Sequence, residues 1–503
     1  MIVDEVTVKA GPRQWAGLAV LMLPVLLISI DNTVLSFALP EISRNLRPSA
    51  AGQLWIVDAY PLVLAGLLVA MGNLGDRFGR RRMLMIGTVG FGAVSALAAF
   101  APSADLLIAA RVLLGFFGAM LMPSTLSLLR NLFTDRRQRR LAIAIWAAGF
   151  SAGSAIGPVV GGVLLEHFWW GSVFLIAVPV LLPLLVLVPL LVPESSDPSP
   201  GPFDLVSILL SMAALTPIVY AIKSVATDGI GVLPIALVAI GLLSGVFFVR
   251  RLLAQPNPML DMRLFRVPTF SGAVIVNLVS VFSLVGFLYF LTQHLQLVIG
   301  LSPLNAALVL IPGVVIIIVT GLLAVPLVRI VRPGFVMAAG LGLCFTAYAM
   351  TAIIGSSSTV TTLIVAFCLL GAGIGAAETL ANDMVIASVP PEKAGAASGV
   401  SETAYELGAV LGTAVLGSIL AAFYRSSIVI PNGVSAVDAQ AARDTLGGAV
   451  EVSSALPGGV GEALLESARS AFDSGVTVTS WFAAAMMIVA ITVTLLTLRK
   501  ARG

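Results

Sequence analysis

Apolar runs that are long enough to cross a lipid bilayer recur along almost the whole of this 503-residue chain. A spanning helix needs about 20 mostly apolar residues, and only helices or closed barrels satisfy their backbone hydrogen bonds within lipid. The strands of a barrel would alternate apolar and polar residues, whereas these runs are continuous. Since 58% of the residues are hydrophobic and only 11% are charged, the sequence predicts an all-α integral membrane protein.

The apolar runs divide into fourteen predicted spans, grouped as six, two and six. We expect an N-terminal six-helix bundle over 1–192, a linker with two extra transmembrane helices over 193–269, and a C-terminal six-helix bundle over 270–503 with a long outer loop at 425–475. Paired six-helix halves are typical of secondary transporters with alternating access. The predicted spans are 15–38, 52–72, 83–101, 105–128, 140–164, 170–192, 204–223, 231–249, 270–292, 303–327, 334–354, 360–385, 395–423 and 477–498.

Clusters of arginine in alternate loops give the predicted orientation. Positively charged residues are enriched in cytoplasmic loops, and an even number of spans places both termini on one side. We therefore expect both termini to be cytoplasmic. The clusters assigned to inner loops are Arg77, Arg80, Arg81 and Arg82, then Arg136, Arg137, Arg139 and Arg140, then Arg250, Arg251, Arg263 and Arg266.

The first span contains one carboxylate, in the string IDNTVLSFALP. No residue between Trp15 and Ile30 is charged, and then Asp31 appears several residues before Pro40. A charge at membrane depth is costly and marks a functional site by default. We interpret Asp31 as a proton site or a cation contact, and the alternative is an interhelical hydrogen-bonding group.

Two further ionisable residues lie at a similar predicted depth. Asp58 in the second span and Arg111 in the fourth are each about six residues inside the outer end, which places all three groups about 9 Å deep in one layer. We interpret Asp31, Asp58 and Arg111 as a proton-coupling network in which the guanidinium pairs with a carboxylate until protonation or substrate changes the pairing. A static salt bridge that fixes helix packing is the alternative.

The string GNLGDRFGRRRML, from Gly72 to Leu84, occupies the predicted inner loop between the second and third spans. Its glycines allow a tight connection, because glycine accepts a positive φ. Its carboxylate can face a helix N-terminus, and its arginines can pair with acids or lipid phosphates. Plain positive-inside charge is the alternative. The residues to which we assign a role in a conformational gate are Gly72, Asp76, Arg77, Gly79 and Arg80.

A second glycine motif, GSAIGPVVGGVL, lies in the fifth span. Gly153, Gly157 and Gly161 recur every four residues and form one bare helical stripe, while Pro158 removes a hydrogen bond. We expect the stripe to pack against the other bundle and to resist leakage, and a plain packing face is the alternative. Asp383, near the cytoplasmic end of the twelfth span, is also predicted to be a gate or cap residue.

Two glutamates in the thirteenth span, in SGVSETAYELGAVLG, lie four residues apart and therefore on one helical face. Because like charges repel at this spacing, we expect one of Glu402 and Glu406 to carry a proton at rest. With Tyr405 beside them, they could receive a lipophilic cation. A pair of neutral, hydrogen-bonded carboxyls in a wet cavity is the alternative. The aromatic residues that could line the same cavity are Trp55, Tyr60, Trp146 and Phe150, although the first two also suit an interfacial belt.

Motifs for other classes of function are missing from the sequence. No phosphate-binding loop follows a predicted strand, so the energy for transport would come from a gradient. The spans contain no nucleophile–base or metal-ligand constellation, which disfavours an intramembrane enzyme, and the lone Cys344 and Cys368 suggest neither a disulfide nor a metal site. We expect a monomer in the lipid bilayer with no cofactor, no metal and no nucleic-acid partner.

Seven strings, in this order along the chain, resemble the fourteen-helix drug:proton antiporter family of the major facilitator superfamily, of the QacA and LfrA type: IDNTVLSFALP, QLWIVD, GDRFGRRR, LMPSTLSLLR, GPVVGG, PMLDMRLF and SETAYELG. The resemblance covers nearly the whole chain. It implies a multidrug efflux pump in a bacterial inner (cytoplasmic) membrane that exchanges protons for lipophilic cations. These are quaternary ammonium compounds, ethidium, acriflavine-type dyes and, in some members, fluoroquinolones.

The resemblance also implies site roles. Asp31 and Asp58 match coupling or cation-recognition acids, Arg111 matches the arginine of the fourth helix, and Glu402 and Glu406 match acids of the thirteenth. One departure is that the span at 303–327 has no acid where QacA-type members carry one, which disfavours divalent substrates more than monovalent ones. Export of an endogenous lipid, metabolite or siderophore on the same scaffold is the alternative function.

Overall fold

Helices make up most of the chain that the structure describes. The computed structural model describes residues 10–196, 204–229, 231–256, 258, 260–389 and 394–499, apart from some side chains, several of them in the first half of α5. Throughout these ranges the regular structure is helical, with no strand. The predicted all-α membrane fold is confirmed.

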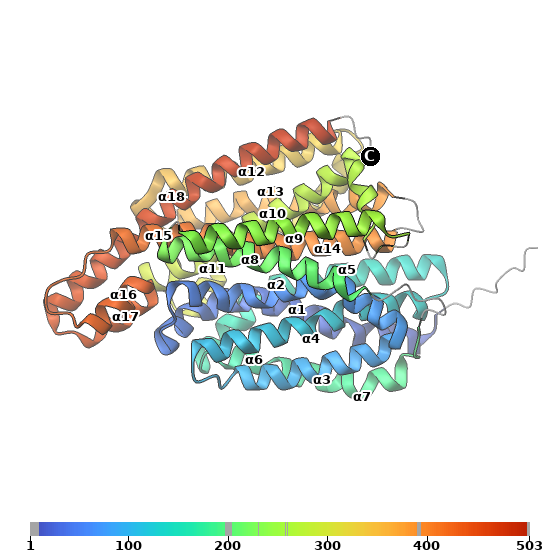
Figure 1. Cartoon of the computed structure of the whole chain (residues 1–503), viewed down its shortest axis with the longest axis horizontal. Helices are drawn as coiled ribbons and strands as arrows, with labels where there is room; N and C mark the ends of the chain where they lie inside the picture. The colour runs from blue at the N-terminus through green and yellow to red at the C-terminus, as the bar shows by residue number, and fades with distance from the viewer. Residues whose placement is uncertain are drawn as a thin grey trace, which may run out of the picture.

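The first half of the molecule is formed by helices α1 to α7, which lie together in the lower part of Figure 1. The first of them is longer than the predicted span, because the buried Pro24 and Pro40 are accommodated within a helix that ends only at Leu46. The bounds are α1 Pro12–Leu46, α2 Ala50–Phe78, α3 Arg80–Ala98, α4 Ala104–Leu132, α5 Arg136–His167, α6 Ser172–Leu175 and α7 Ala177–Leu191.

The second half is formed by α10 to α15 and α18. Two of its long helices include a π-helical segment, which places an extra residue in a turn. The bounds are α10 Pro268–Gln293 with the π-helical η2 His294–Val298, α11 Pro303–Leu327, α12 Pro333–Ile354 with η3 Gly355–Ser357, α13 Val360–Ala387, α14 Ala394–Leu411 with the π-helical η5 Gly412–Gly417, α15 Ser418–Ser427, and α18 Gly458–Leu498.

Two extra helices form a hairpin between the halves. They are α8 Leu205–Asp228 and α9 Val232–Ala254, followed by the 3-10 helix η1 Met262–Arg266. The hairpin crosses the front of the molecule in Figure 1, and α8 packs on α2 of the first half and on η5 and α15 of the second. α9 is mostly exposed and apolar, as a lipid-facing helix should be.

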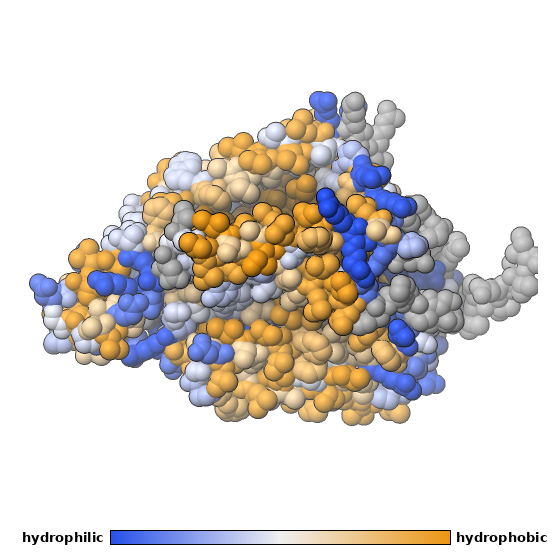
Figure 2. Space-filling view, viewed as in Figure 1, coloured by the Kyte–Doolittle hydropathy of each residue, from blue (hydrophilic) through white to orange (hydrophobic). Residues whose placement is uncertain are grey.

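Figure 2 shows a broad apolar belt with polar residues gathered at two ends, as expected of a protein that spans a bilayer. We call one end the arginine-rich end, because α3 begins there with Arg80, Arg81 and Arg82, and α9 ends there just after Arg250 and Arg251. The other end is formed by the short helices α16 Ala436–Asp444 and α17 Leu446–Ala455. We call it the hairpin end after these two helices, and the name does not refer to the α8–α9 hairpin. α1 begins and α18 ends at the arginine-rich end (Figure 1).

Among the described residues, twelve helices are long and apolar enough to cross a membrane. α3, whose first three residues are arginines, and α5 are not among them. The predicted number of fourteen spans therefore stays a prediction, as do the three predicted domains.

The long outer loop predicted at 425–475 is largely helical. After α16 and α17, the last long helix already begins at Gly458, well before the predicted start at 477. The reason is an apolar stripe, Leu464, Ala468, Ala471 and Phe472, which recurs every three to four residues and is buried against neighbouring helices.

Candidate functional site

A cavity of about 830 Å³ lies between the two halves. Its walls come from α1, α4 and α5 on one side and from α10, α11, α13 and α14 on the other. Arg130, Ala387 and Ser398, which lie close to the helix termini at the arginine-rich end, belong to the lining. The cavity therefore extends to that end of the molecule.

The halves meet directly at the hairpin end. The Gln53 side chain of α2 donates a hydrogen bond of 3.0 Å to the Gln293 side-chain oxygen of α10, and both residues are buried. The Gln296 side chain of η2 donates to the Phe37 carbonyl of α1 at 3.2 Å. These contacts close the hairpin end while the arginine-rich end is open.

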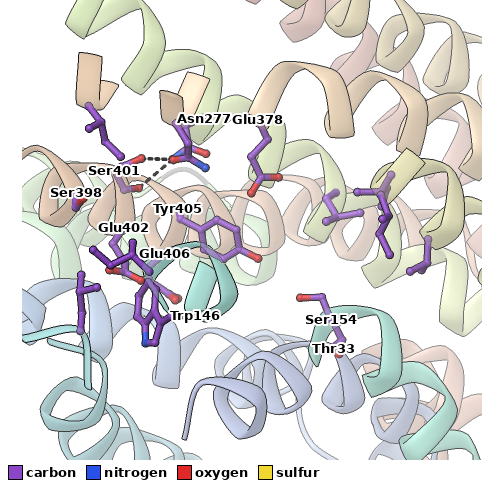
Figure 3. A pocket seen from close by; sticks show the side chains of 18 of the residues that line it. Thr33, Trp146, Ser154, Asn277, Glu378, Ser398, Ser401, Glu402, Tyr405 and Glu406 are labelled. Atoms are coloured by element: carbon purple, nitrogen blue, oxygen red, sulfur yellow. Dashed lines mark hydrogen bonds between the residues drawn. The ribbon is translucent and has the colours of Figure 1, made fainter. Parts of the chain in front are cut away.

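Three carboxyl groups line the cavity from the second half (Figure 3). Glu378 projects from α13, and Glu402 and Glu406 project from one face of α14. Within the part of the chain that the structure describes, none of the three forms an ion pair. Glu406 is only 1% exposed, and its Oε2 has no hydrogen-bond partner among the described residues. A buried carboxyl without a partner is costly unless a ligand or a proton completes it.

Aromatic and amide groups complete the lining. The Trp146 indole donates a 3.2 Å hydrogen bond to Thr125 Oγ1, which fixes the ring in the wall. The Tyr405 hydroxyl points across the cavity toward Ser154 (Figure 3). Asn277 Nδ2 donates to Ser401 at 3.0 Å, and the other amide atom, Oδ1, is buried with no partner within the described residues. The lining thus combines a ring face, apolar side chains and several acceptors.

Asp31 and Arg111 form an ion pair beside this cavity, with 2.7 Å between Oδ2 and Nη1. Arg111 is only 1% exposed, its Nε donates to the Ile56 carbonyl at 3.1 Å, and its guanidinium lies 4.6 Å from the centre of the Tyr60 ring. Asp31 is 11% exposed and acts electrostatically on Glu406. The pair therefore links α1, α2 and α4 at a point close to the cavity acids.

Asp58 has a different partner from the one that we predicted. It is fully buried, and its Oδ2 lies 2.8 Å from the ammonium of Lys223 in α8. Sequence reasoning missed Lys223 because the predicted span ended at that residue. A lysine within an apolar run is nevertheless the same signal that pointed to Asp31.

The predicted aromatic residues divide into two groups. Trp146 lines the cavity, whereas Trp55 and Tyr60 do not, because their rings face the internal cations Lys223 and Arg111. The side chain of Phe150 lies outside the described residues. Glu378 and Asn277 were not among the predicted site residues, although each is a polar side chain within an apolar span.

The connection between α2 and α3 is as tight as its glycines suggested. Gly79 has a φ of +107° between the two helices, a conformation that favours glycine. Gly72 lies earlier in the same helix, α2, where it faces Pro123 of α4. Arg77 is exposed in the last turn of α2.

The carboxylate at the N-terminus of α3 is not the predicted one. Asp76 pairs with the Arg80 side chain at 2.7 Å, whereas Glu194, after α7, accepts hydrogen bonds from the backbone N–H groups of Arg81 and Arg82 at 2.9 and 3.2 Å. Asp76 lies one turn before Arg80, so the guanidinium reaches it first. Glu194 is free to approach the exposed N–H groups.

The glycine stripe of α5 does not face the other half, so the predicted partner was wrong. Side chains built at Gly153, Gly157 and Gly161 would meet α1, which belongs to the same half. The residue that faces α11 of the other half is Gly162, where a Cβ would lie 2.9 Å from the Leu304 Cα. The stripe falls on α1 because four-residue spacing keeps one helical face against one neighbour.

The two remaining gate residues lie apart. Pro158 lines the cavity from α5. Asp383 is exposed on α13, three residues before Ile386, which lines the cavity near the arginine-rich end. The gating roles of these residues and of the glycine motifs stay predictions.

We expect Gly157→Ala to lower the unfolding temperature, because its Cβ would overlap the Thr33 side chain of α1. Overpacking of this kind costs about 1–3 kcal/mol. Gly342→Ala in α12 is the matched control, since nothing lies within 4 Å of its added Cβ. Thermal unfolding of the purified variants checks both, and equal unfolding temperatures would show that α1 and α5 are not tightly packed.

Comparison with known proteins shows which family model and which relatives this chain matches. The model of the Major Facilitator Superfamily matches residues 21–413. The multidrug efflux pump LfrA of Mycolicibacterium smegmatis is 56% identical over 484 residues, which are 96% of each chain. The methyl viologen resistance protein SmvA of Salmonella typhimurium is 37% identical over 92% of this chain and 93% of its own length.

Solved structures agree on the fold. A bacterial homologue of the human lysosomal transporter Spinster, in an inward-facing and unoccupied conformation, superposes with a TM-score of 0.65 at 18% identity. The match covers 97% of this chain and 99% of that one. At this level of identity, the likeness concerns the fold alone.

Proposed function

Because this chain belongs to the Major Facilitator Superfamily, we propose that it is a proton-coupled multidrug efflux antiporter that exports lipophilic cations. The chain is a multi-pass membrane transporter rather than an enzyme. The proposed substrates are quaternary ammonium compounds, ethidium and acriflavine-type dyes. The named relatives LfrA and SmvA support drug export as the direction of transport.

The observation that carries the proposal is the set of three cavity carboxyls without an ion-pair partner among the described residues. Glu378, Glu402 and Glu406 supply negative charge, while Trp146 and Tyr405 supply ring faces that attract an organic cation. The rest of the wall is largely apolar. A lipophilic cation matches all three features, whereas a small hydrated ion matches only the charge.

The proposed cycle begins in the conformation described above. The positive-inside rule assigns the arginine-rich end to the cytoplasm, so the cavity is open inward and a cation enters from the cytoplasm or the inner leaflet. When the hairpin end opens instead, protons from outside reach the cavity acids, displace the cation and drive the return. The coupling acids are then Glu402, Glu406 and Asp31.

The decisive experiment is ethidium transport in proteoliposomes under an imposed pH gradient. We expect uptake into vesicles whose lumen is acidic, and no uptake when the gradient is collapsed. A parallel panel of neutral lipophilic compounds separates drug-cation export from export of an endogenous lipid or metabolite. Transport of the neutral compounds alone, or transport indifferent to the gradient, would contradict the proposal.

A further inference from the structure

Lys223 of α8 is held by three groups of α2. Its side chain is 1% exposed, and its ammonium lies 2.8 Å from Asp58 Oδ2. The same nitrogen donates a hydrogen bond of 3.1 Å to the Leu54 carbonyl and lies 3.8 Å from the centre of the Trp55 ring. A carboxylate, a carbonyl and an aromatic face are the groups that recognise an ammonium ion.

This cluster is separate from the central cavity, since Leu54, Trp55, Asp58 and Lys223 do not line it. It lies where four elements meet: Leu62 of α2 and Val219 of α8 pack in one buried cluster with Val410 of α14 and Ala414 of η5. Leu54 also touches Gly417 of η5. The lysine is thus buried at a junction between the two halves, on the side toward the hairpin end.

Three polar groups besides Lys223 lie near Asp58. Thr413 of η5 approaches its carboxylate, and the charge of Arg111 from α4 acts on it at longer range. Tyr289 of α10 is also within electrostatic range. Among the described residues, Lys223 is the cation that contacts Asp58 directly, so the buried charge of Asp58 depends on it.

We propose that Asp58, Trp55 and the Leu54 carbonyl form a second cation site, distinct from the central cavity, which takes primary ammonium ions and which Lys223 occupies as a tethered ligand. The carboxylate and the carbonyl both accept N–H hydrogen bonds, so a primary ammonium fits and a quaternary one does not. The extra hairpin α8–α9 therefore supplies a charge that the six-helix halves lack at this point.

The site has a consequence for export, and this part rests on the proposed function. Opening the hairpin end must separate α2 from α14 and η5, the same surfaces that bury the Asp58–Lys223 pair. The ammonium of Lys223 compensates the negative charge of Asp58 as long as the hairpin end is closed. Water from outside reaches the pair only when it opens.

The test is rescue of a truncated lysine. Lys223→Ala removes the atoms Cγ to Nζ, which together have the composition of propylammonium. We expect propylammonium to raise the unfolding temperature of the purified full-length variant by roughly 2 °C at saturating concentration. Tetramethylammonium at the same concentration should have no effect, and propylammonium should have none on the variant that also carries Asp58→Asn.

Arg251→Ala is the matched control, because it breaks a second ion pair of the same hairpin, with Asp204 at 2.9 Å, far from Trp55. It should not respond to propylammonium. No shift for Lys223→Ala, or an equal shift with tetramethylammonium, overturns the site.

If Lys223→Ala yields no folded protein, the two ammonium ions are added during extraction instead. Recovery of monodisperse protein with propylammonium alone supports the site, and recovery with neither ion contradicts it. Ethidium export by the wild type is measured in parallel. Its failure would refute the proposed function, while the unfolding data still decide the cation site.

Discussion

Asp31→Asn is expected to reduce proton-driven ethidium export at least a hundredfold. The substitution removes the carboxylate that lies 2.7 Å from Arg111 and leaves a guanidinium that is 1% exposed without its counter-charge. Breaking a buried ion pair from one side costs about 3–5 kcal/mol. Loss of export could therefore come from lost coupling or from lost packing, and the measurement must separate these causes.

The double variant Asp31→Asn, Arg111→Gln separates them, because it removes both charges and leaves no uncompensated ion. We expect it to recover most of the unfolding temperature while export stays abolished. Asp31→Glu, which keeps the charge, should retain part of the export. If the double variant exports ethidium at the wild-type rate, the pair serves packing alone, and our interpretation of Asp31 as a coupling residue fails.

The second large effect concerns the acids of α14. Glu402→Gln combined with Glu406→Gln should weaken ethidium binding about ten- to hundredfold, because a hydrogen bond to a charged group contributes about 1.5–3 kcal/mol. Both side chains line the cavity. Binding can be followed by ethidium fluorescence or by the quenching of tryptophan fluorescence in purified protein.

A neutral lipophilic ligand is the control for this variant, since its affinity should hardly change when carboxyls become amides of nearly the same volume. Asp383→Asn is a matched control substitution, because this carboxyl is exposed and lies outside the cavity lining. An unchanged ethidium affinity in the glutamine variant would show that the acids do not hold the cation.

The sequence predicted the parts of this molecule that depend on membrane physics. Continuous apolar runs require helices, and the cost of buried charge pointed to Asp31, Arg111 and Glu406, each of which is buried or nearly so. Four-residue spacing correctly placed Glu402 and Glu406 on one face of α14. These inferences need only local periodicity or the dielectric contrast between lipid and water.

What the sequence did not predict depends on which helices become neighbours. The equal depth of Asp31, Asp58 and Arg111 suggested one network, but α8 places Lys223 against Asp58. The stripe of Gly157 suggested a close contact without identifying α1 as the partner. In the same way, Glu194 caps α3 from a segment more than a hundred residues along the chain. Depth and periodicity fix a residue's level and face, whereas its partner depends on the fold.

Proton release on ligand binding tests the central claim most directly. Ethidium is added to the purified wild-type protein in weakly buffered solution, and the pH of the medium is recorded as the cation binds. If cation and proton compete for the carboxyls around the cavity, the medium acidifies, and the signal is lost in the Glu402→Gln, Glu406→Gln variant. Tight ethidium binding by the wild type without any release of protons would contradict the account.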